Sequence, residues 1–296
     1  MPARVSRFKL PPTLIFLLPW IITLAVFWAY PVLYSLFLSF SNYGVLDPQI
    51  QFIGLANYSH LFSDPDFWVA LKNTSYFVVG TIPFTTILAL LVAILVNQKM
   101  PLRGLFRAGF FIPSVTSMVV IALVFTNLYA RDGYLTLLVS ILGLPAPEQG
   151  FLFSTSTALP SIMLMDVWVS FGYYMLLYLA ALQGIPNELY ESAEIAGAGR
   201  WQKFRFITLP YLRPMTLLII LINTIRSFQI FVEVFVMTKG GPLNSTLTVV
   251  YDVYELGFNR FQMGYASAVA YVLFFIILIF AFLQMKLLRL GKGVGD

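Results

Sequence analysis

Long apolar stretches separated by short polar segments make up most of this chain. A helix needs about 20 predominantly apolar residues to cross a bilayer. The first stretch is too long for the apolar part of a signal peptide, and no small-residue cleavage site follows it, so we expect a retained helix. The pattern predicts six transmembrane helices, at about 13–40, 73–97, 105–130, 158–183, 208–236 and 263–287.

The composition supports a membrane protein. Hydrophobic residues make up 59% of the 296 positions and charged residues 10%, whereas soluble domains are about a quarter charged. The chain has no cysteine, and therefore no disulfide and no thiolate metal site. Its one histidine, His60, lies in a polar segment, which argues against a histidine-built metal or catalytic site. We expect an all-α polytopic membrane protein without catalytic residues or a metal site.

Lysine and arginine are distributed unequally between the two ends of the predicted helices. One side carries only Arg131, Lys239 and Arg260, with Lys72 at a helix edge. Cytoplasmic loops of membrane proteins are enriched in lysine and arginine. We therefore interpret the net charge of +5 as a result of membrane topology and not as a sign of nucleic-acid binding. The opposite side carries thirteen bases: Arg4, Arg7, Lys9, Lys99, Arg103, Arg107, Arg200, Lys203, Arg205, Arg213, Lys286, Arg289 and Lys292.

This asymmetry predicts that both termini are cytoplasmic. We expect a cytoplasmic N-terminal segment at 1–12, a single transmembrane domain at 13–290 and a cytoplasmic tail at 291–296. The segments at about 41–72, 131–157 and 237–262 then face outward, and they are long enough to fold against an external partner. Small residues from Ala266 to Ala268 predict close helix packing in the last span.

A charged segment, ELYESAEIAGAGRWQKF, interrupts the apolar pattern between the fourth and fifth predicted helices. Pro186 suits the first turn of a helix, and the glutamates of 188–194 are stabilised near a helix N-terminus. Gly197 and Gly199 supply a stop. The sequence therefore predicts a short cytoplasmic helix at about 186–199. Its small residues would permit close approach of another protein, but a solvated amphipathic loop helix is the alternative reading.

The charged segment resembles the EAA motif of ABC-importer permeases. The pattern E-x-A-x-x-x-G, nine residues, I-x-L-P is present as Glu191, Ala193, Gly197, Ile207, Leu209 and Pro210. There are two departures: Ser192 replaces the usual Ala, and Ala196 replaces an Asp that often precedes the Gly. The segments YPVLYSLFLSFSNY, FIGLANY, FWVALKNTSYF, LFRAGFFIPSV and TKGGPLNST also look like carbohydrate-type permeases, and they resemble the maltose- and glycerol-phosphate-type first permease more than its usual partner.

The resemblance implies a type I importer permease in a bacterial or archaeal cytoplasmic membrane, surrounded by lipid. It implies a heterodimer with a second permease, two ATPase subunits that use ATP and Mg²⁺, and an external binding protein. The chain lacks G-x-x-x-x-G-K-[ST] and would bind no nucleotide cofactor itself. The short helix would then be a coupling helix that docks on the ATPase through Glu188, Glu191, Ser192, Ala193, Gly197, Ala198 and Arg200.

Polar residues inside the fourth and fifth predicted helices mark a candidate substrate pathway. Ionisable groups at membrane depth are costly and usually face a protein interior or a wet cavity. One reading is a sugar cavity with aromatic walls, in which Phe171, Phe228 and Phe231 would also contribute; the other is polar contact between helices, including an Arg226–Asp166 or Arg226–Glu233 ion pair. The candidate residues are Asp166, Tyr173, Tyr174, Asn223, Arg226, Gln229 and Glu233, the last four within about 120° on a continuous helix.

Three functions remain to be weighed. A permease for a sugar or oligosaccharide is favoured, and a sugar phosphate is the alternative substrate because Arg226 suits an anion. An ion-coupled secondary carrier would use Asp166 and Glu233 as ion sites, but it would have no ATPase to engage through a cytoplasmic helix. A membrane enzyme is disfavoured because no carboxylate pair lies beside a nucleophile.

Overall fold

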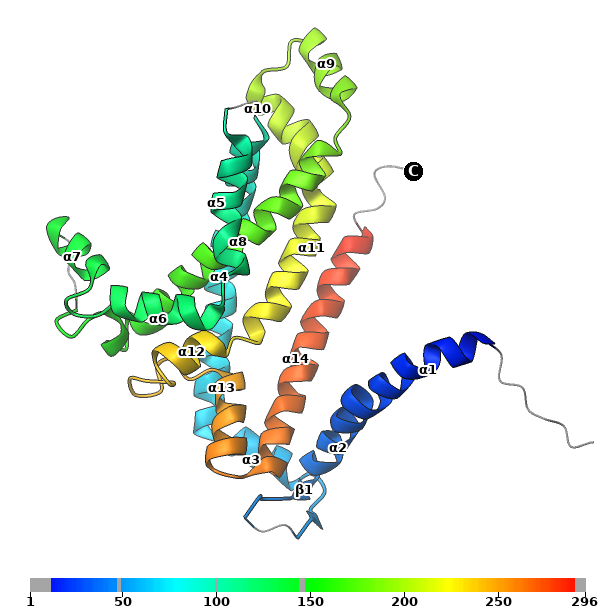
Figure 1. Ribbon diagram of the computed structural model, residues 1–296, viewed down its shortest axis with the longest axis vertical. Coiled ribbons are helices and arrows are strands. Elements are labelled where there is room, and N and C mark those ends of the chain that lie inside the picture. The colour runs from blue at the N-terminus through cyan, green and yellow to red at the C-terminus, as the bar shows by residue number, and fades with distance from the viewer. Residues whose placement is uncertain (1–11, 47–48, 99–100, 144–146, 291–296) are drawn as a thin grey trace, which may run out of the picture.

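The structure is a computed structural model that describes residues 12–46, 49–98, 101–143 and 147–290. It is an elongated helical bundle (Figure 1). The predicted terminal segments 1–12 and 291–296, apart from Pro12, lie outside the described residues. The helices are α1 (Pro12–Leu24), α2 (Tyr30–Ser39), α3 (Ala56–Ser63), α4 (Pro65–Asn97), α5 (Arg103–Val115), α6 (Met118–Leu128), α7 (Tyr134–Ile141), α8 (Ala158–Gln183), α9 (Asn187–Ile195), α10 (Arg200–Lys203), α11 (Leu209–Phe228), α12 (Val232–Met237), α13 (Val249–Tyr254) and α14 (Met263–Leu290).

Short irregular elements join several of these helices. Turns of π-helix connect α1 to α2, α10 to α11, and follow α13, while a single 3-10 turn precedes α8. The two short strands form an antiparallel hairpin at one end of the bundle. The bounds are Ala25–Ala29, Phe204–Thr208 and Glu255–Asn259 for the π-turns, Phe151–Phe153 for the 3-10 turn, and Ser41–Asn42 (β1) and Gln51–Phe52 (β2) for the strands.

The described residues contain five helices that are long and apolar enough to cross a membrane, or six if a bent pair is one span. This confirms an all-α polytopic architecture. The spans are Phe16–Ser39, Pro65–Asn97, Ala158–Gln183, Arg200–Met237 and Met263–Lys286, with Arg103–Val115 and Met118–Leu128 as the bent pair.

The third predicted span, at about 105–130, is not one straight helix. Its two halves, α5 and α6, meet at 94°; between them Thr116 has extended backbone and Ser117, with φ −56° and ψ 124°, is also not helical. Pro113 lies near the end of α5 and removes one N–H from the helical ladder. Ser114 then fixes the bend against α8, since its hydroxyl donates to the Val169 carbonyl at 2.6 Å and accepts from the Tyr173 N–H at 3.1 Å.

The fourth span, α8, is the central helix of the bundle. In the most apolar 18-residue stretch of α8, 72% of the residues are buried within the chain, compared with 6% in the corresponding stretch of the first span. It packs against α4, α5 and α11 (Figure 1). A Cβ at Gly172 would collide with the Phe110 carbonyl oxygen of α5, so only glycine allows this approach. In α14, Ala266 and Ala268 are buried as expected for close packing.

The fifth predicted span, at about 208–236, begins earlier and contains a break. Helix begins at Arg200 and continues through α10 and the following π-turn into α11, so residues before Leu209 are part of the span. The helix ends at Phe228, and Phe231 has φ −144° and ψ −56° before α12 starts. The polar residues of this span therefore do not share one face of a continuous helix.

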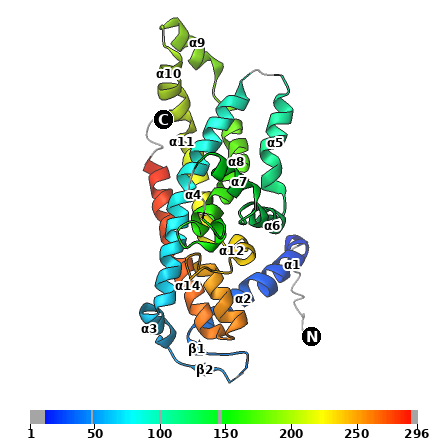
Figure 2. The same ribbon diagram turned by 90° about the vertical axis from the view of Figure 1, so that its left-hand side faces the viewer.

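One of the three long segments that are expected to face outward packs closely against the bundle. The segment 237–248 packs on α4, where the Asn73 side-chain amide donates to the carbonyls of Asn244 (2.8 Å) and Leu247 (3.0 Å). The Thr74 hydroxyl accepts from the Val249 N–H at 3.0 Å. Figure 2 shows α3 and the β1–β2 hairpin at one end of the molecule and α9 and α10 at the other. The segment 237–248, α3 and the β1–β2 hairpin therefore lie at the end opposite the charged helix, whereas α7 of the segment 131–157 packs beside α6.

Candidate functional site

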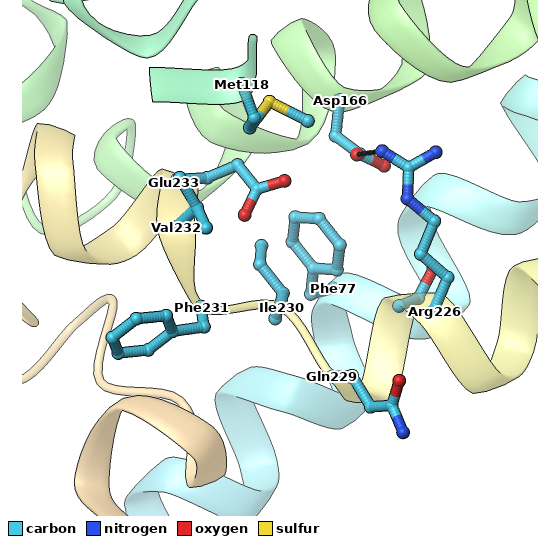
Figure 3. Close-up of a pocket in the computed structure, with 10 residues that line it drawn as sticks. Phe77, Met118, Asp166, Arg226, Gln229, Ile230, Phe231, Val232 and Glu233 are labelled. Atoms are coloured by element: carbon cyan, nitrogen blue, oxygen red, sulfur yellow. Dashed lines mark ion pairs between the residues drawn. The ribbon is translucent and has the colours of Figure 1, made fainter. Parts of the chain in front are cut away.

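A cavity of about 270 Å³ lies where the fifth span breaks. The break turns Gln229–Phe231 out of the helix, so that α11 and α12 present residues to the same space. Figure 3 shows the carboxylates of Asp166 and Glu233 and the guanidinium of Arg226 directed into it. The lining residues are Phe77, Met118, Asp166, Arg226, Ser227, Gln229, Ile230, Phe231, Val232 and Glu233.

Asp166 of α8 and Arg226 of α11 form an ion pair across the cavity. An Arg226 guanidinium nitrogen lies 3.6 Å from Asp166 Oδ1, with side-chain exposures of 42% for Arg226 and 7% for Asp166. The Ser170 hydroxyl, one turn along α8, donates to the same Oδ1 at 3.3 Å. The buried carboxylate is therefore partly compensated, while the guanidinium keeps access to the cavity.

Glu233 is the second buried carboxylate of the cavity. It stands in the first turn of α12 and is 7% exposed. Within the described residues it forms no ion pair with a cation, so of the two predicted partners of Arg226 it is Asp166 that is paired. Figure 3 shows the Glu233 carboxylate across the cavity from Arg226.

The structure separates the remaining pathway candidates. Asn223 is 1% exposed and lies outside the cavity, where its side-chain oxygen accepts from the Ser227 hydroxyl at 3.4 Å. Tyr174 is fully buried and lies beside Arg226, outside the set of residues that line the cavity. Tyr173 is 43% exposed and its ring packs edge-on against Tyr174 at 5.3 Å. Gln229 lines the cavity, but its amide points away from the carboxylates (Figure 3).

The aromatic residues expected to line the pathway are also divided. Phe171 packs on Phe110 with ring centroids 5.9 Å apart, and Phe228 packs on Phe280 at 5.4 Å, so both belong to the core. Phe231 lines the cavity. Phe171 and Phe228 therefore do not line this cavity, because their rings pack against neighbouring spans.

The structure adds lining residues that the sequence did not single out. Phe77 of α4 and Met118 at the start of α6 face the cavity (Figure 3). Behind Phe231, rings of α12, α13 and the following turn form a continuous cluster, with centroid separations of 5.2 to 6.4 Å: Phe231, Phe235, Tyr251, Tyr254 and Phe258. Only the abundance of aromatic residues signalled this cluster, because its members come from separate elements.

The charged helix α9 projects from the end of the bundle (Figure 1). It begins after Pro186, which stands at the N-cap and not in the first turn as the sequence suggested. At its other end Gly197 has φ +77°, and its N–H donates to the Glu194 carbonyl at 3.0 Å. The Ala198 N–H donates to the Ala193 carbonyl at 2.9 Å. These two bonds form a Schellman cap, which requires a left-handed residue and so favours glycine.

One face of α9 is attached to the membrane spans. The Tyr190 hydroxyl lies 2.9 Å from the Thr208 hydroxyl at the start of α11. Lys203 donates to Glu194 at 2.6 Å, and this contact lowers the pKa of the Glu194 carboxyl below its ordinary value. Leu189 packs against the core cluster that contains Tyr178 and Leu182 of α8. These contacts join α9 to the start of α11 and to α8.

The opposite face of α9 is exposed in the described chain. Glu188, Glu191 and Ser192 are exposed, and the Ser192 hydroxyl donates to the Glu188 carbonyl of its own helix at 2.7 Å. Ile195, which the sequence reading did not single out, is 90% exposed. It follows Glu188, Glu191 and Ser192 at helical spacing. Of the other candidates, Gly197 and Arg200 are exposed, and Ala193 and Ala198 are partly buried.

The described residues contain no group of three or more histidine, aspartate or glutamate side chains placed to hold a metal ion. The site thus consists of two parts on one helical path. The cavity lies at the C-terminal end of α11, and the exposed face of α9 lies beside the N-terminal start of the same span.

Comparison with known proteins gives a family match over most of the chain. Residues 65–289 match the model of the binding-protein-dependent transport system inner membrane component. The chain is 37% identical over 284 residues to the lactose transport system permease protein LacF of Rhizobium radiobacter, covering 94% of both chains. It is 33% identical over 283 residues to the arabinooligosaccharides transport system permease protein AraP of Bacillus subtilis, covering 95% of this chain and 90% of that protein.

Two solved structures share the fold. A chain of a bacterial alginate ABC transporter, in complex with an alginate pentasaccharide-bound periplasmic protein, superposes with a TM-score of 0.83 at 23% identity and 96% coverage of both chains. A chain of the MetNI methionine ABC transporter superposes with a TM-score of 0.56 at 17% identity, covering 77% of this chain and 98% of that one. At these identities the likeness concerns the fold, which is that of an importer permease.

Proposed function

Because the chain belongs to the family of binding-protein-dependent transport system inner membrane components, we propose that it is the permease subunit of an ATP-driven importer for a sugar or oligosaccharide. Relatives that span nearly its whole length are permeases for lactose and for arabinooligosaccharides. The observation that carries the proposal is the connection of an exposed, Schellman-capped helix to the membrane span that ends at a polar cavity.

Coupling runs through this connection. The exposed face of α9 docks on a separate ATPase subunit, on which ATP and Mg²⁺ act, since this chain has no P-loop sequence. ATP-driven closure of the ATPase pair displaces α9, and the Tyr190–Thr208 contact passes the displacement to α11. At the other end of α11, Arg226 changes its position relative to Asp166 and opens or closes the cavity. Glu191 and Gly197 are the central residues of the docking face.

The importer requires further subunits. The first span is almost unburied within this chain, which supports contact of that span with lipid and with a second permease that completes the pathway. The surface built by α3, the β1–β2 hairpin and the segment 237–248 suits an external substrate-binding protein. Two ATPase subunits, one for each permease, complete the proposed assembly in the cytoplasmic membrane of a bacterium or archaeon.

We expect the α9 end of the molecule to be cytoplasmic. The chain has no cysteine, so single cysteines report topology without background labelling. Asn187→Cys on α9 and Leu243→Cys in the outer segment, where Leu243 is 92% exposed, form a matched pair. A membrane-impermeant maleimide added to spheroplasts should label Leu243→Cys at once and Asn187→Cys only after permeabilisation. The reverse pattern would place both termini outside and remove the coupling assignment.

The proposed subunit composition is tested by purification in mild detergent. The chain is tagged at its C-terminus, isolated from its native membrane and analysed by mass spectrometry. We expect a P-loop ATPase and a second six-helix permease to co-purify in stoichiometric amounts. A chain that purifies alone and still transports after reconstitution would contradict the proposal.

A further inference from the structure

We propose that the cavity at the break of the fifth span accepts uncharged sugars and rejects anionic ones, and that Glu233 sets this selectivity. The inference rests on the proposed function and specifies its substrate class. The inference excludes a sugar phosphate as substrate. An unpaired Arg226 in the fifth span would otherwise favour such an anion. The argument follows from the charges that line the cavity.

The positive charge of the cavity is already paired with a carboxylate. Arg226 is the one cation among the described lining residues, and its guanidinium lies 3.6 Å from Asp166 Oδ1. Asp166 is 5% exposed and has no other cation within ion-pair distance in the described chain. A buried carboxylate without a counter-ion is costly, so Arg226 cannot leave it for a phosphate without a penalty.

Glu233 adds a second carboxylate and no further cation. Its side chain is buried and directed into the cavity (Figure 3). With Asp166 ionised in its pair with Arg226, the three groups sum to one negative charge when Glu233 is ionised and to zero when Glu233 is protonated. In neither state does the cavity have a surplus positive charge. An incoming phosphate or carboxylate therefore meets repulsion or no compensation, and both are unfavourable in a medium of low dielectric constant.

The same groups suit the hydroxyls of a neutral sugar. The carboxylate of Glu233 accepts hydrogen bonds, and a guanidinium has five N–H donors, of which only part is directed to Asp166. Arg226 is 42% exposed and keeps donors available to the cavity. The ring of Phe231 provides an apolar wall. The cavity thus offers both donors and acceptors without requiring charge on the ligand.

The experiment measures binding of lactose and lactose 6-phosphate to the detergent-purified permease–ATPase complex without binding protein, so that the permease alone sets the preference. We expect the wild-type complex to bind lactose at least ten-fold more tightly than lactose 6-phosphate. Glu233→Gln should reduce this ratio several-fold, and Asp166→Asn, which releases Arg226, should raise affinity for the phosphate. The matched control is Glu148→Gln, an exposed acid outside the cavity.

The outcomes separate the two proposals. Equal binding of both ligands by the wild-type complex, or a ratio that Glu233→Gln leaves unchanged in a complex that elutes as wild type, would overturn the inference while leaving a sugar permease. If neither lactose nor a panel of neutral di- and trisaccharides binds, the sugar substrate class and the inference both fail. Co-elution of the ATPase with each variant verifies that the complex is assembled.

Discussion

Gly197→Val should reduce ATP-driven uptake at least ten-fold while the chain remains inserted in the membrane. Gly197 has φ +77°, and a left-handed conformation costs an L-residue about 1–2 kcal/mol, most for a β-branched one. No atom lies within 4 Å of a Cβ built at this position, so the effect comes from backbone conformation and not from a clash. The strain unwinds the Schellman cap and displaces the docking face of α9. Uptake is measured in proteoliposomes and insertion by labelling.

Two controls distinguish coupling from general destabilisation. Gly197→Asn should retain most of the uptake, because asparagine tolerates the left-handed conformation. Gly54→Val creates a similar strain at φ +60° in open space at the opposite end of the molecule, and it should leave ATP hydrolysis coupled to transport. Glu191→Ala, which leaves the cap of α9 unchanged, should weaken ATPase binding. It removes the proposed charge-assisted hydrogen bond to the ATPase subunit, and such a bond contributes about 1.5–3 kcal/mol. Full uptake by both Gly197→Val and Glu191→Ala would refute the coupling helix.

Arg226→Ala should destabilise the chain more than Asp166→Asn, although both substitutions remove the same ion pair. Loss of Arg226 leaves Asp166, with a side-chain exposure of 7%, without a cation and close to the buried Glu233. Leaving a buried polar group unsatisfied costs about 1–3 kcal/mol, and more if it is charged. In Asp166→Asn the guanidinium, which is 42% exposed, can be hydrated, so we expect a cost within about 1 kcal/mol.

Thermal unfolding of the detergent-solubilised complex measures this asymmetry. Each kcal/mol shifts the midpoint by about 2–4 °C in a domain of about 150–250 residues, and we expect a shift near the lower end of this range for a chain of 296 residues. The double variant Arg226→Ala with Asp166→Asn should recover part of the loss, because the uncompensated charge is gone. Equal losses for the two single variants, or no recovery in the double variant, would show that the pair does not carry the charge balance of the cavity.

The number and type of spans could be predicted because apolar length is a local property of the sequence. The residue at which each helix starts was harder to predict. Asp64 caps α4 by accepting from the Asp66 N–H at 2.9 Å, with Pro65 at the first helical position, yet hydropathy placed this start at about 73. The signal was present in SDPDFW, but the charged residues of the first two turns concealed the helix from a search for apolar runs.

The break after Phe228 could not be predicted, because no glycine or proline stands there. The Thr248 hydroxyl donates to the Ile230 carbonyl at 3.3 Å, and these residues are 18 positions apart. A tertiary contact therefore satisfies a backbone group that the break leaves free. The predicted 120° grouping failed for the same reason. Asp166, Arg226, Gln229 and Glu233 nevertheless line one cavity, because α12 leaves the axis of α11 and packs against α6.

The candidates that lie elsewhere show the limit of reading polarity alone. Asn223 has the polarity expected of a pathway residue, but its helix face packs inside the bundle. Phe77 and Met118 line the cavity without any polar signal, since only the fold brings α4 and α6 to this place. Helix α9 was easier to predict, because its cap, its charge and its EAA-like spacing are all encoded within one short segment.

ATP-dependent uptake by the purified complex tests the account most directly. The complex that co-purifies with this chain is reconstituted in proteoliposomes with its binding protein, and uptake of labelled lactose and of a panel of neutral oligosaccharides is followed. The account predicts uptake of at least one of these sugars that requires hydrolysable ATP on the α9 side and persists when an ionophore collapses the proton gradient. Uptake that proceeds without ATP and stops with the ionophore would identify Asp166 and Glu233 as ion sites of a secondary carrier and contradict it.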